Sequence, residues 1–490
     1  QAATNASSLA AATAQELRSI GPIIVLAGRP DWTWDLARRF KRESNRREVT
    51  DDVALVQRFL SAEFGEDYEL SSLLEFGVGV HHSGLSDEAR RLIEWLFERE
   101  QLPVLVATTT IAQGVNFPVA GVVVAQHLQW DGRRSAPMSP ADFWNIIGRV
   151  GRADQSTVGV VALAAVDEAK ADALRTFVAA QVTSLNSTLI GMVDDVLSAG
   201  RELSLHELFN RPEWSAFLQY LAHSYRQIGD PDKFSQQIER VLRGTLGFQK
   251  LREINLPVAQ QLISGAQAYG SRLAGKPLKL VDSTGFSWET VSITLRNLSQ
   301  AKISEKIWDP ERLFSGKGSD LKKLMGILLE VPELRDNLTA ATGGAGPNGD
   351  LLARIVSDWV TGMPLPDLAK RYFSAGTQRD ATDAVTECCR NLFGRLAQTA
   401  SWGLGALQAM TLSDGFTAME PRLQQAVRNI PSRVFYGVNS DDAIAMRLLG
   451  VPRNAAQPLA DTLGPSVIPQ PLSKVRAALA EADDLVWGKA

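Results

Sequence analysis

Apolar runs and amphipathic segments alternate over the first 175 residues. Short runs rich in β-branched residues predict buried strands at 22–28, 102–110, 121–128 and 158–166. Residues 86–100 repeat apolar positions at helical spacing, and Ser86 is the expected N-cap. Strands that alternate with helices favour a parallel sheet with helices on both faces.

Strand-like runs nearly vanish after about residue 175, and the amphipathic patterns that remain predict a mainly helical second half. The glycine-rich stretch 342–350 predicts the clearest loop, and residues 281–290 predict a turn whose Ser and Thr residues open a helix. Near the C-terminus, a helix–turn–helix pattern has Gly450 and Pro452 at its turn. Arg453, directly after this turn, is a candidate contact to a nucleic-acid backbone.

The composition narrows the function classes. The 51 basic and 55 acidic residues give a formal net charge of -4, so any nucleic-acid site must be a local patch. The only cysteines, Cys388 and Cys389, are adjacent and cannot build a disulfide framework or a four-ligand zinc site, and we expect no protein-bound metal. No apolar run of about eighteen residues and no secretory signal occurs, so we expect a cytoplasmic protein without membrane association.

Three segments of the first half carry candidate chemistry, and they follow one another in a fixed order. They are "VGVHHSGLSDEARRLIEWLF" (78–97), "VLVATTTIAQGVNFP" (104–118) and "PADFWNIIGRVGRAD" (140–154). Each leads from an apolar run to small, polar or basic residues, as expected where an open parallel sheet presents the carboxyl ends of its strands. The threonines 108–110 offer hydroxyl and N–H groups to the phosphate oxygens of a nucleic acid, and Gly114 permits close backbone approach.

Together these segments resemble the second motor domain of superfamily 2 helicases, in the Ski-type group, with its paired His, "VATxTxAxGVNxP" and "GRxGR" patterns. The resemblance implies a RecA-like α/β domain over residues 1–175. It further implies a winged-helix-like domain over 176–275 and a helical, ratchet-like bundle over 276–490 that closes over single-stranded nucleic acid.

The resemblance also implies roles for individual residues. The residues that would contact nucleic acid are His82, Ser83, Gly84, Thr108, Thr109 and Thr110. The residues that would lie beside ATP are Gly114, Asn116, Asn145 and Gly148. Arg149 and Arg152 would be arginine fingers, which stabilise charge on the transferring γ-phosphoryl group. The chain departs from the family at Asn145, where Gln is usual, and in its triple threonine, which replaces Thr-Pro-Thr.

A complete motor also needs a phosphate-binding loop and an acidic Mg²⁺-binding motif from a first RecA-like domain. The nearest loop candidate, "GSRLAGKP" (270–277), has Pro277 where a hydroxyl must ligate Mg²⁺, and it follows a helical pattern. The acidic stretch 161–170 is interpreted as the last strand of the sheet and the start of a helix. We therefore expect the domain that holds most of the ATP and Mg²⁺ to lie upstream of Gln1 or in a separate chain, and this chain alone to be inactive.

Several residues have two interpretations. His81 and His82 suit a capping or core-edge role as well as nucleic-acid contact. Trp359 and Trp402 are either base-stacking residues or core residues. The basic segment 38–47 either grips phosphates or forms a solvated helix face.

The expected function is the C-terminal half of an ATP-dependent helicase or translocase. It would move along single-stranded DNA or RNA and unwind duplex, with single-stranded or partly duplex nucleic acid and the first motor domain as partners. The alternative is a non-enzymatic nucleic-acid-binding or regulatory subunit with a helicase-like shape. Phosphate contacts do not report the 2′-OH, so the residues do not distinguish DNA from RNA.

Overall fold

The computed structural model divides the chain into two compact units. The first comprises Gln1–Thr183 and Met363–Gly394, and the second comprises Ser184–Gly362 and Arg395–Ala490. The residues that the structure describes are 5–113, 119–126, 128–130, 135–138, 140–148, 159–179, 193, 212–316, 319–343, 346–374, 381–412, 416, 419–464 and 471–481.

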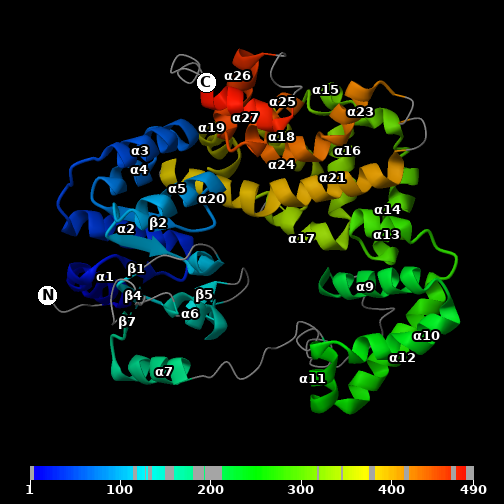
Figure 1. Cartoon of the computed structure of the whole chain (residues 1–490), viewed down its shortest axis with the longest axis horizontal. Coiled ribbons are helices and arrows are strands. Elements are labelled where there is room, and N and C mark those ends of the chain that lie inside the picture. Colours follow the sequence, from blue (N-terminus) through cyan, green and yellow to red (C-terminus); the bar gives the residue numbers. More distant parts are fainter. Residues whose placement is uncertain are drawn as a thin grey trace. The chain divides into compact units, whose positions relative to one another are not determined.

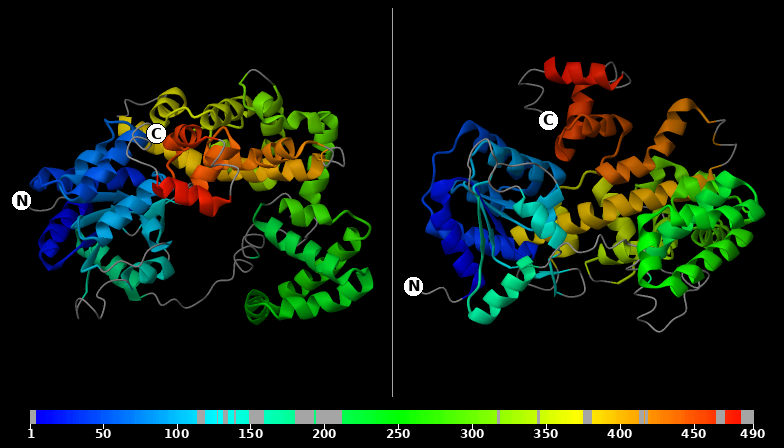
Figure 2. Two further views of the ribbon diagram at one scale, coloured as in Figure 1. Left: turned by 45° about the horizontal axis from the view of Figure 1, so that its top comes forward. Right: turned by 60° about the horizontal axis from the view of Figure 1, so that its bottom comes forward.

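A five-stranded parallel sheet forms the centre of the first unit (Figure 1 and Figure 2). Its strands are β1 (Ile23–Leu26), β2 (Val78–His81), β3 (Val104–Ala107), β4 (Gly121–Val124) and β7 (Val160–Leu163). Their order across the sheet is β2-β3-β1-β4-β7, and all pairs are parallel. The four apolar runs in the sequence form β1, β3, β4 and β7, which confirms those predictions. Strands β1 to β4 are buried along their whole length, as parallel strands covered on both faces must be.

Helices cover both faces of this sheet. The chain passes from β1 to β2 through α2 (Pro30–Glu43), α3 (Asp51–Phe64) and α4 (Glu69–Leu74), and it returns from β2 to β3 through α5 (Asp87–Glu98). These two crossovers run in opposite directions across the sheet, so right-handed connections place them on opposite faces. The predicted N-cap of α5 is confirmed, because Ser86 Oγ accepts a hydrogen bond from the N–H of Ala89.

The remaining elements of this part of the first unit are α1 (Ala6–Leu17), η1 (Arg18–Ile20), η2 (Thr109–Gln113), β5 (Leu128–Trp130), β6 (Ser135–Pro137), α6 (Pro140–Ile147) and α7 (Glu168–Ala179). Strands β5 and β6 form a separate antiparallel pair. Asp167 Oδ1 accepts a hydrogen bond from the N–H of Lys170 at the start of α7. The acidic residues after β7 therefore begin a helix, as the sequence predicts for 161–170.

A segment from the helical half of the chain completes the first unit. It contains α19 (Leu365–Leu368), the π-helical turn η5 (Ala369–Phe373) and α20 (Ala381–Asn391). Thr382 Oγ1 on α20 accepts a hydrogen bond from the N–H of Glu69, 3.0 Å away at the start of α4. The sequence pattern predicts these helices but assigns them to the bundle over 276–490, because helical spacing does not report which surface a helix packs against.

The second unit is helical throughout its described residues. Its first helices are α9 (Pro212–Ile228), α10 (Pro231–Arg243), α11 (Leu246–Ile254), α12 (Leu256–Leu273), α13 (Lys279–Thr284), α14 (Trp288–Gln300), η4 (Glu305–Trp308), α15 (Pro310–Leu313), α16 (Asp320–Leu329), α17 (Pro332–Ala340) and α18 (Gly349–Val360). After the π-helical turn η6 (Leu392–Leu396) come α21 (Ala397–Thr411), α23 (Pro421–Arg428), α24 (Ile430–Tyr436), α25 (Asp441–Leu448), α26 (Arg453–Leu463) and α27 (Leu472–Glu481). In the part of the chain that can be described, no helix is both long and apolar enough to cross a membrane.

Local signals in this unit agree with the structure. Ser287 Oγ accepts from the N–H of Thr290 and opens α14, as predicted from residues 281–290. Gly270 lies inside α12, where a Cβ would come within 2.3 Å of the Phe234 ring, so the stretch 270–277 starts in a packed helix and is not a phosphate loop. The winged-helix assignment and the domain boundaries at 175 and 275 stay predictions.

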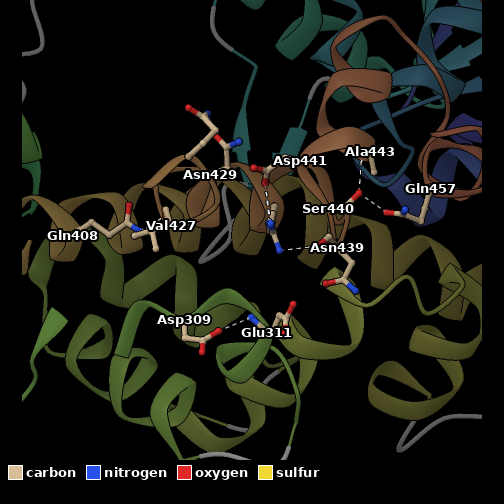
Figure 3. A network of polar contacts seen from close by, with 12 residues as sticks. Asp309, Glu311, Gln408, Val427, Asn429, Asn439, Ser440, Asp441, Ala443 and Gln457 are labelled. Atoms are coloured by element: carbon tan, nitrogen blue, oxygen red, sulfur yellow. Dashed lines mark hydrogen bonds and ion pairs between the residues drawn. The ribbon is translucent and has the colours of Figure 1, made fainter. Parts of the chain in front are cut away.

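The helix–turn–helix pattern near the C-terminus is confirmed by α25 and α26, with Gly450 at a φ of 90° between them. Ser440 caps α25 through the N–H of Ala443 and also hydrogen-bonds to Gln457 on α26 (Figure 3). Arg453, by contrast, is buried. Its guanidinium donates to the carbonyls of Gly437 and Trp359, so in this structure it cannot reach a nucleic-acid backbone.

Candidate functional site at the carboxyl edge of the sheet

The first two motifs meet where β2 and β3 end side by side. The N–H of Thr108 donates to the carbonyl of His81 over 3.0 Å. The Thr110 hydroxyl lies 3.0 Å from the Thr108 hydroxyl and 3.4 Å from His81 Nδ1. Neighbouring parallel strands end at the same edge of a sheet, so motifs that are 30 residues apart in the chain form one hydrogen-bonded group.

His81 connects this group to the helix behind it. Its Nε2 lies 2.8 Å from Glu94 Oε1 on α5, and its ring is buried. A carboxylate on one ring nitrogen fixes the orientation of the other, so Glu94 orients His81 toward the threonines. The sequence analysis missed Glu94, although a carboxylate next to Ile93 on the buried side of an amphipathic helix was a usable signal. Of the two interpretations of His81, the core-edge role describes its position.

His82 is completely buried beside the same edge. Its Nδ1 accepts a hydrogen bond from the N–H of Gly84 over 3.0 Å, so the proton of the neutral ring is on Nε2. Nε2 has no partner among the described residues, and the ring meets Trp34 edge to face at 5.6 Å. Burial, with a smaller contribution from His81, lowers the pKa of His82 to about 3. The ring is therefore neutral at physiological pH.

Gly84 lies directly against α20. A Cβ on Gly84 would come within 2.8 Å of the Thr386 methyl group and 3.0 Å of His82 Nδ1. Glycine at this position thus permits close packing of a helix from the same chain. In this structure neither His82 nor Gly84 is open to a nucleic-acid strand, and only the half-buried Ser83 between them retains surface.

The third motif approaches the same edge through α6, which packs against η2, the turn that holds the threonines. Asn145 on α6 and Gly148 directly after it are exposed. Trp144 is 45% exposed next to Asn145, and the sequence analysis did not single it out. The other predicted nucleotide and catalytic residues, Gly114, Asn116, Arg149 and Arg152, lie outside the described residues.

The two predicted stacking residues of the second unit, Trp359 and Trp402, differ in their exposure to solvent. Trp359 is 1% exposed, its Nε1 donates to the carbonyl of Val434, and the Arg453 guanidinium lies 4.0 Å from its ring centroid. Base stacking by Trp359 would require it to leave this core. Trp402 is 41% exposed, with its Nε1 bound to the carbonyl of Thr284, so part of its ring is accessible.

Half of the basic residues of segment 38–47 are paired with acids. Arg38 lies 2.8 Å from Glu69, and Arg46 lies 3.0 Å from Glu75. Arg39 pairs with Glu43 one helical turn later. Lys41 contacts the Ser72 hydroxyl and Arg47 the carbonyl of Gln101, so the solvated helix face is only partly neutralised.

No three His, Cys, Asp or Glu side chains in the described parts of the chain are grouped to hold a metal ion. Asn145 and Gly148 are the described members of the predicted nucleotide set, and both are exposed.

Comparison with known proteins identifies the region that holds these motifs. Residues 47–154 match the family described as the helicase conserved C-terminal domain, and this span contains all three motif segments. Hachiman protein HamB of Bacillus cereus is 24% identical over 412 residues, which cover 74% of this chain and 35% of that protein. That similarity therefore extends beyond the sheet domain into the helical half.

Two further relatives are eukaryotic. Activating signal cointegrator 1 complex subunit 3 of Mus musculus is 32% identical over 198 residues, or 39% of this chain and 9% of that protein. The DExH-box ATP-dependent RNA helicase DExH11 of Arabidopsis thaliana is 35% identical over 119 residues, or 24% of this chain and 9% of that protein. The chain thus spans about a third or less of the length of these relatives.

Proposed function

Since this chain contains the C-terminal helicase domain of a superfamily 2 helicase, we propose that it forms the second motor half of an ATP-dependent nucleic-acid helicase or translocase. The observation that carries the proposal is the hydrogen-bonded group of His81, Thr108 and Thr110 at the strand ends, against which α6 brings the third motif. In the proposal, a first RecA-like domain outside this chain holds most of the ATP and Mg²⁺.

The threonine turn is the proposed nucleic-acid contact. Thr109 and Thr110 are partly exposed, whereas Thr108 is 8% exposed and hydrogen-bonds to Thr110. Thr108 and the Glu94–His81 pair therefore position the partly exposed Thr110 hydroxyl, which in the proposal donates to a phosphate oxygen of a strand together with Thr109. The helical domains, winged-helix-like over 176–275 and ratchet-like over 276–490, would guide the same strand, with Trp402 as the accessible candidate for stacking on bases.

The arginine motif is the proposed catalytic contribution of this chain. Bound ATP with Mg²⁺ supplies the transferable phosphoryl group, and Arg149 and Arg152 stabilise the negative charge that spreads over it. In the proposal, the nucleotide lies between the two RecA-like domains, and this chain contacts it through Gly114, Asn116, Asn145 and Gly148. The two domains open and close at each hydrolysis event, and this motion moves the strand past the threonine turn.

The test is reconstitution of the motor from two halves. ATP hydrolysis is measured for this chain alone, for a first RecA-like domain alone, and for the two combined, each with and without single-stranded DNA and RNA. We expect strand-stimulated hydrolysis only in the combination. Strong hydrolysis by this chain alone contradicts the proposal. Strand binding without hydrolysis in the combination would instead favour a non-enzymatic nucleic-acid-binding subunit.

A further inference from the structure

The opposite edge of the sheet has a cleft that none of the helicase motifs occupies. The cleft has a volume of about 500 Å³. Its walls come from the end of α1 and η1, from the last residue of α2 with residues 44–47 after it, and from Pro103. We call it the arginine cleft, because Arg18, Arg46 and Arg47 line it.

The arginine cleft lies at the amino ends of the strands. Arg18 belongs to η1, which precedes β1, and Pro103 directly precedes β3. Arg47 Nη1 donates over 3.0 Å to the carbonyl of Gln101, before the same strand. A four-residue strand is about 10 Å long, and the cleft lies at the opposite ends of the strands from His81 and Thr110. The whole strand length therefore separates the two places.

Two of the three arginines lack a carboxylate partner. Arg18 Nη1 donates to the neutral oxygens of Gln15, at 2.8 Å, and Ser44, at 3.0 Å. Arg47 donates to a backbone carbonyl, and neither arginine forms an ion pair with any carboxylate of the described residues. Burial, and then the nearby charge of Arg47, lower the pKa of Arg18. Arginine remains protonated at neutral pH, so the fold holds two like charges together without an internal counter-ion.

The one acid in the described lining of the cleft is paired with a cation, and so is the acid beside Arg46. Glu43 lines the cleft and pairs with Arg39 at 3.1 Å, and Glu75 pairs with Arg46 at 3.0 Å. The cleft is therefore positive, and the Asn45 amide adds a hydrogen-bond donor to its lining. A positive concave surface lined by guanidinium and amide N–H groups suits an oxyanion.

We infer that the arginine cleft binds a phosphate group, with Arg18 and Arg47 as its principal contacts. Each guanidinium presents a planar fork of N–H groups that matches phosphate oxygens, and the two positive charges match a phosphate dianion better than a single carboxylate. The phosphate group belongs either to a mononucleotide or to the backbone of a nucleic-acid strand. The inference does not depend on ATP hydrolysis at the carboxyl edge.

Calorimetric titration of the full chain tests the inference with three probes, namely inorganic phosphate, AMP and a single-stranded oligonucleotide. Arg18→Gln and Arg47→Gln are each expected to raise the Kd for phosphate roughly tenfold, and the double variant to abolish binding at this site. Arg58→Gln is the matched control, because Arg58 is exposed on α3 outside the cleft and its replacement changes the net charge equally. A double variant that binds phosphate as tightly as this control overturns the inference.

Two further results complete the test. Arg47→Lys retains the charge without the planar fork, so it should bind phosphate more weakly than the wild type and more tightly than Arg47→Gln, with an unchanged melting temperature. Phosphate binding that is lost in Arg149→Ala but retained in the double variant overturns the inference, because the phosphate then binds at the arginine motif. If the double variant weakens AMP binding but not oligonucleotide binding, the phosphate source is a nucleotide. The reverse result identifies a strand.

Discussion

The two edges of the parallel sheet differ in how their polar groups are satisfied. At the carboxyl edge, His81, Glu94 and the threonines bond to one another, and α20 packs against Gly84. At the amino edge, among the residues that the structure describes, Arg18 and Arg47 bond to neutral oxygens and to no carboxylate. The helicase motifs mark the first edge, and no motif marks the second.

This difference shows two ways in which a fold prepares a binding surface. At the carboxyl edge, hydrogen bonds to Thr108 and His81 fix the direction of the partly exposed Thr110 hydroxyl, and such preorganisation favours a defined contact. At the amino edge, uncompensated charge attracts an anion with less demand on geometry. Two sets of substitutions and one pH titration test this comparison.

The largest effect is expected at the arginine motif. In the reconstituted motor, Arg149→Ala and Arg152→Ala should each lower kcat for ATP hydrolysis by about 10³-fold or more. Each substitution removes a guanidinium whose positive charge stabilises the negative charge on the transferring phosphoryl group. Steady-state kinetics measure the loss of kcat. Arg58→Gln is the control, because Arg58 lies outside the three motif segments and outside the lining of the arginine cleft. A kcat equal to that of the control would remove the catalytic role from the carboxyl edge.

A smaller effect, on the free energy of unfolding, is expected from a substitution at Gly84, where α20 packs against the carboxyl edge. Gly84→Ala places a Cβ against Thr386 and His82, and overpacking of this kind typically lowers the free energy of unfolding by about 1–3 kcal/mol. Urea denaturation measures the change. Gly326→Ala on α16 is the matched control, since its Cβ would meet no described atom within 4 Å, and it should stabilise its helix by up to about 1 kcal/mol. Equal stability of the two variants would show that α20 does not pack on Gly84.

The smallest effect is expected from mild acid. The folded pKa of His82 is about 3, whereas the unfolded ring has the ordinary pKa of 6.5, so between these values the unfolded chain binds the extra proton. The stabilisation is fully present above pH 6.5 and decreases as the pH falls, by at most about 1.4 kcal/mol per pH unit. The arginines of the other edge stay charged throughout this range.

Urea denaturation from about pH 7 to about pH 5.5, over which the loss is at most about 1.4 kcal/mol, detects this dependence. His82→Asn is the control variant, because its side-chain oxygen can accept the Gly84 N–H bond and does not titrate. We expect the wild type to lose more stability than His82→Asn as the pH falls. Parallel curves for the two proteins would contradict the assignment of a buried neutral ring.

Much of the first unit could be predicted from the sequence. The strands at β1, β3, β4 and β7 and the Ser86 cap of α5 follow from short-range patterns, namely β-branched runs and helical spacing with a capping residue. The order of the three motifs was also sufficient to predict that they approach one edge, because parallel strands share their carboxyl ends.

Other features of the site were beyond local pattern. His81 and His82 are adjacent histidines, yet the ring of His81 bonds to Glu94 and the ring of His82 is buried beside Trp34. Trp359 and Trp402 likewise looked equivalent, and only packing separates the core residue from the partly exposed one. Burial of a side chain depends on residues far away in the chain. The residues next to it in the sequence do not show which distant residues will cover it.

Local sequence was sufficient to predict the parallel α/β domain, the helical character of the second half and the resemblance to a helicase C-terminal domain, because these depend on periodicity and on ordered motifs. The tertiary structure alone decided that α20 covers Gly84 and that Arg18 and Arg47 share a cleft. The physical reason is that secondary-structure signals are short-range, whereas burial and electrostatic compensation arise when distant segments of the chain meet.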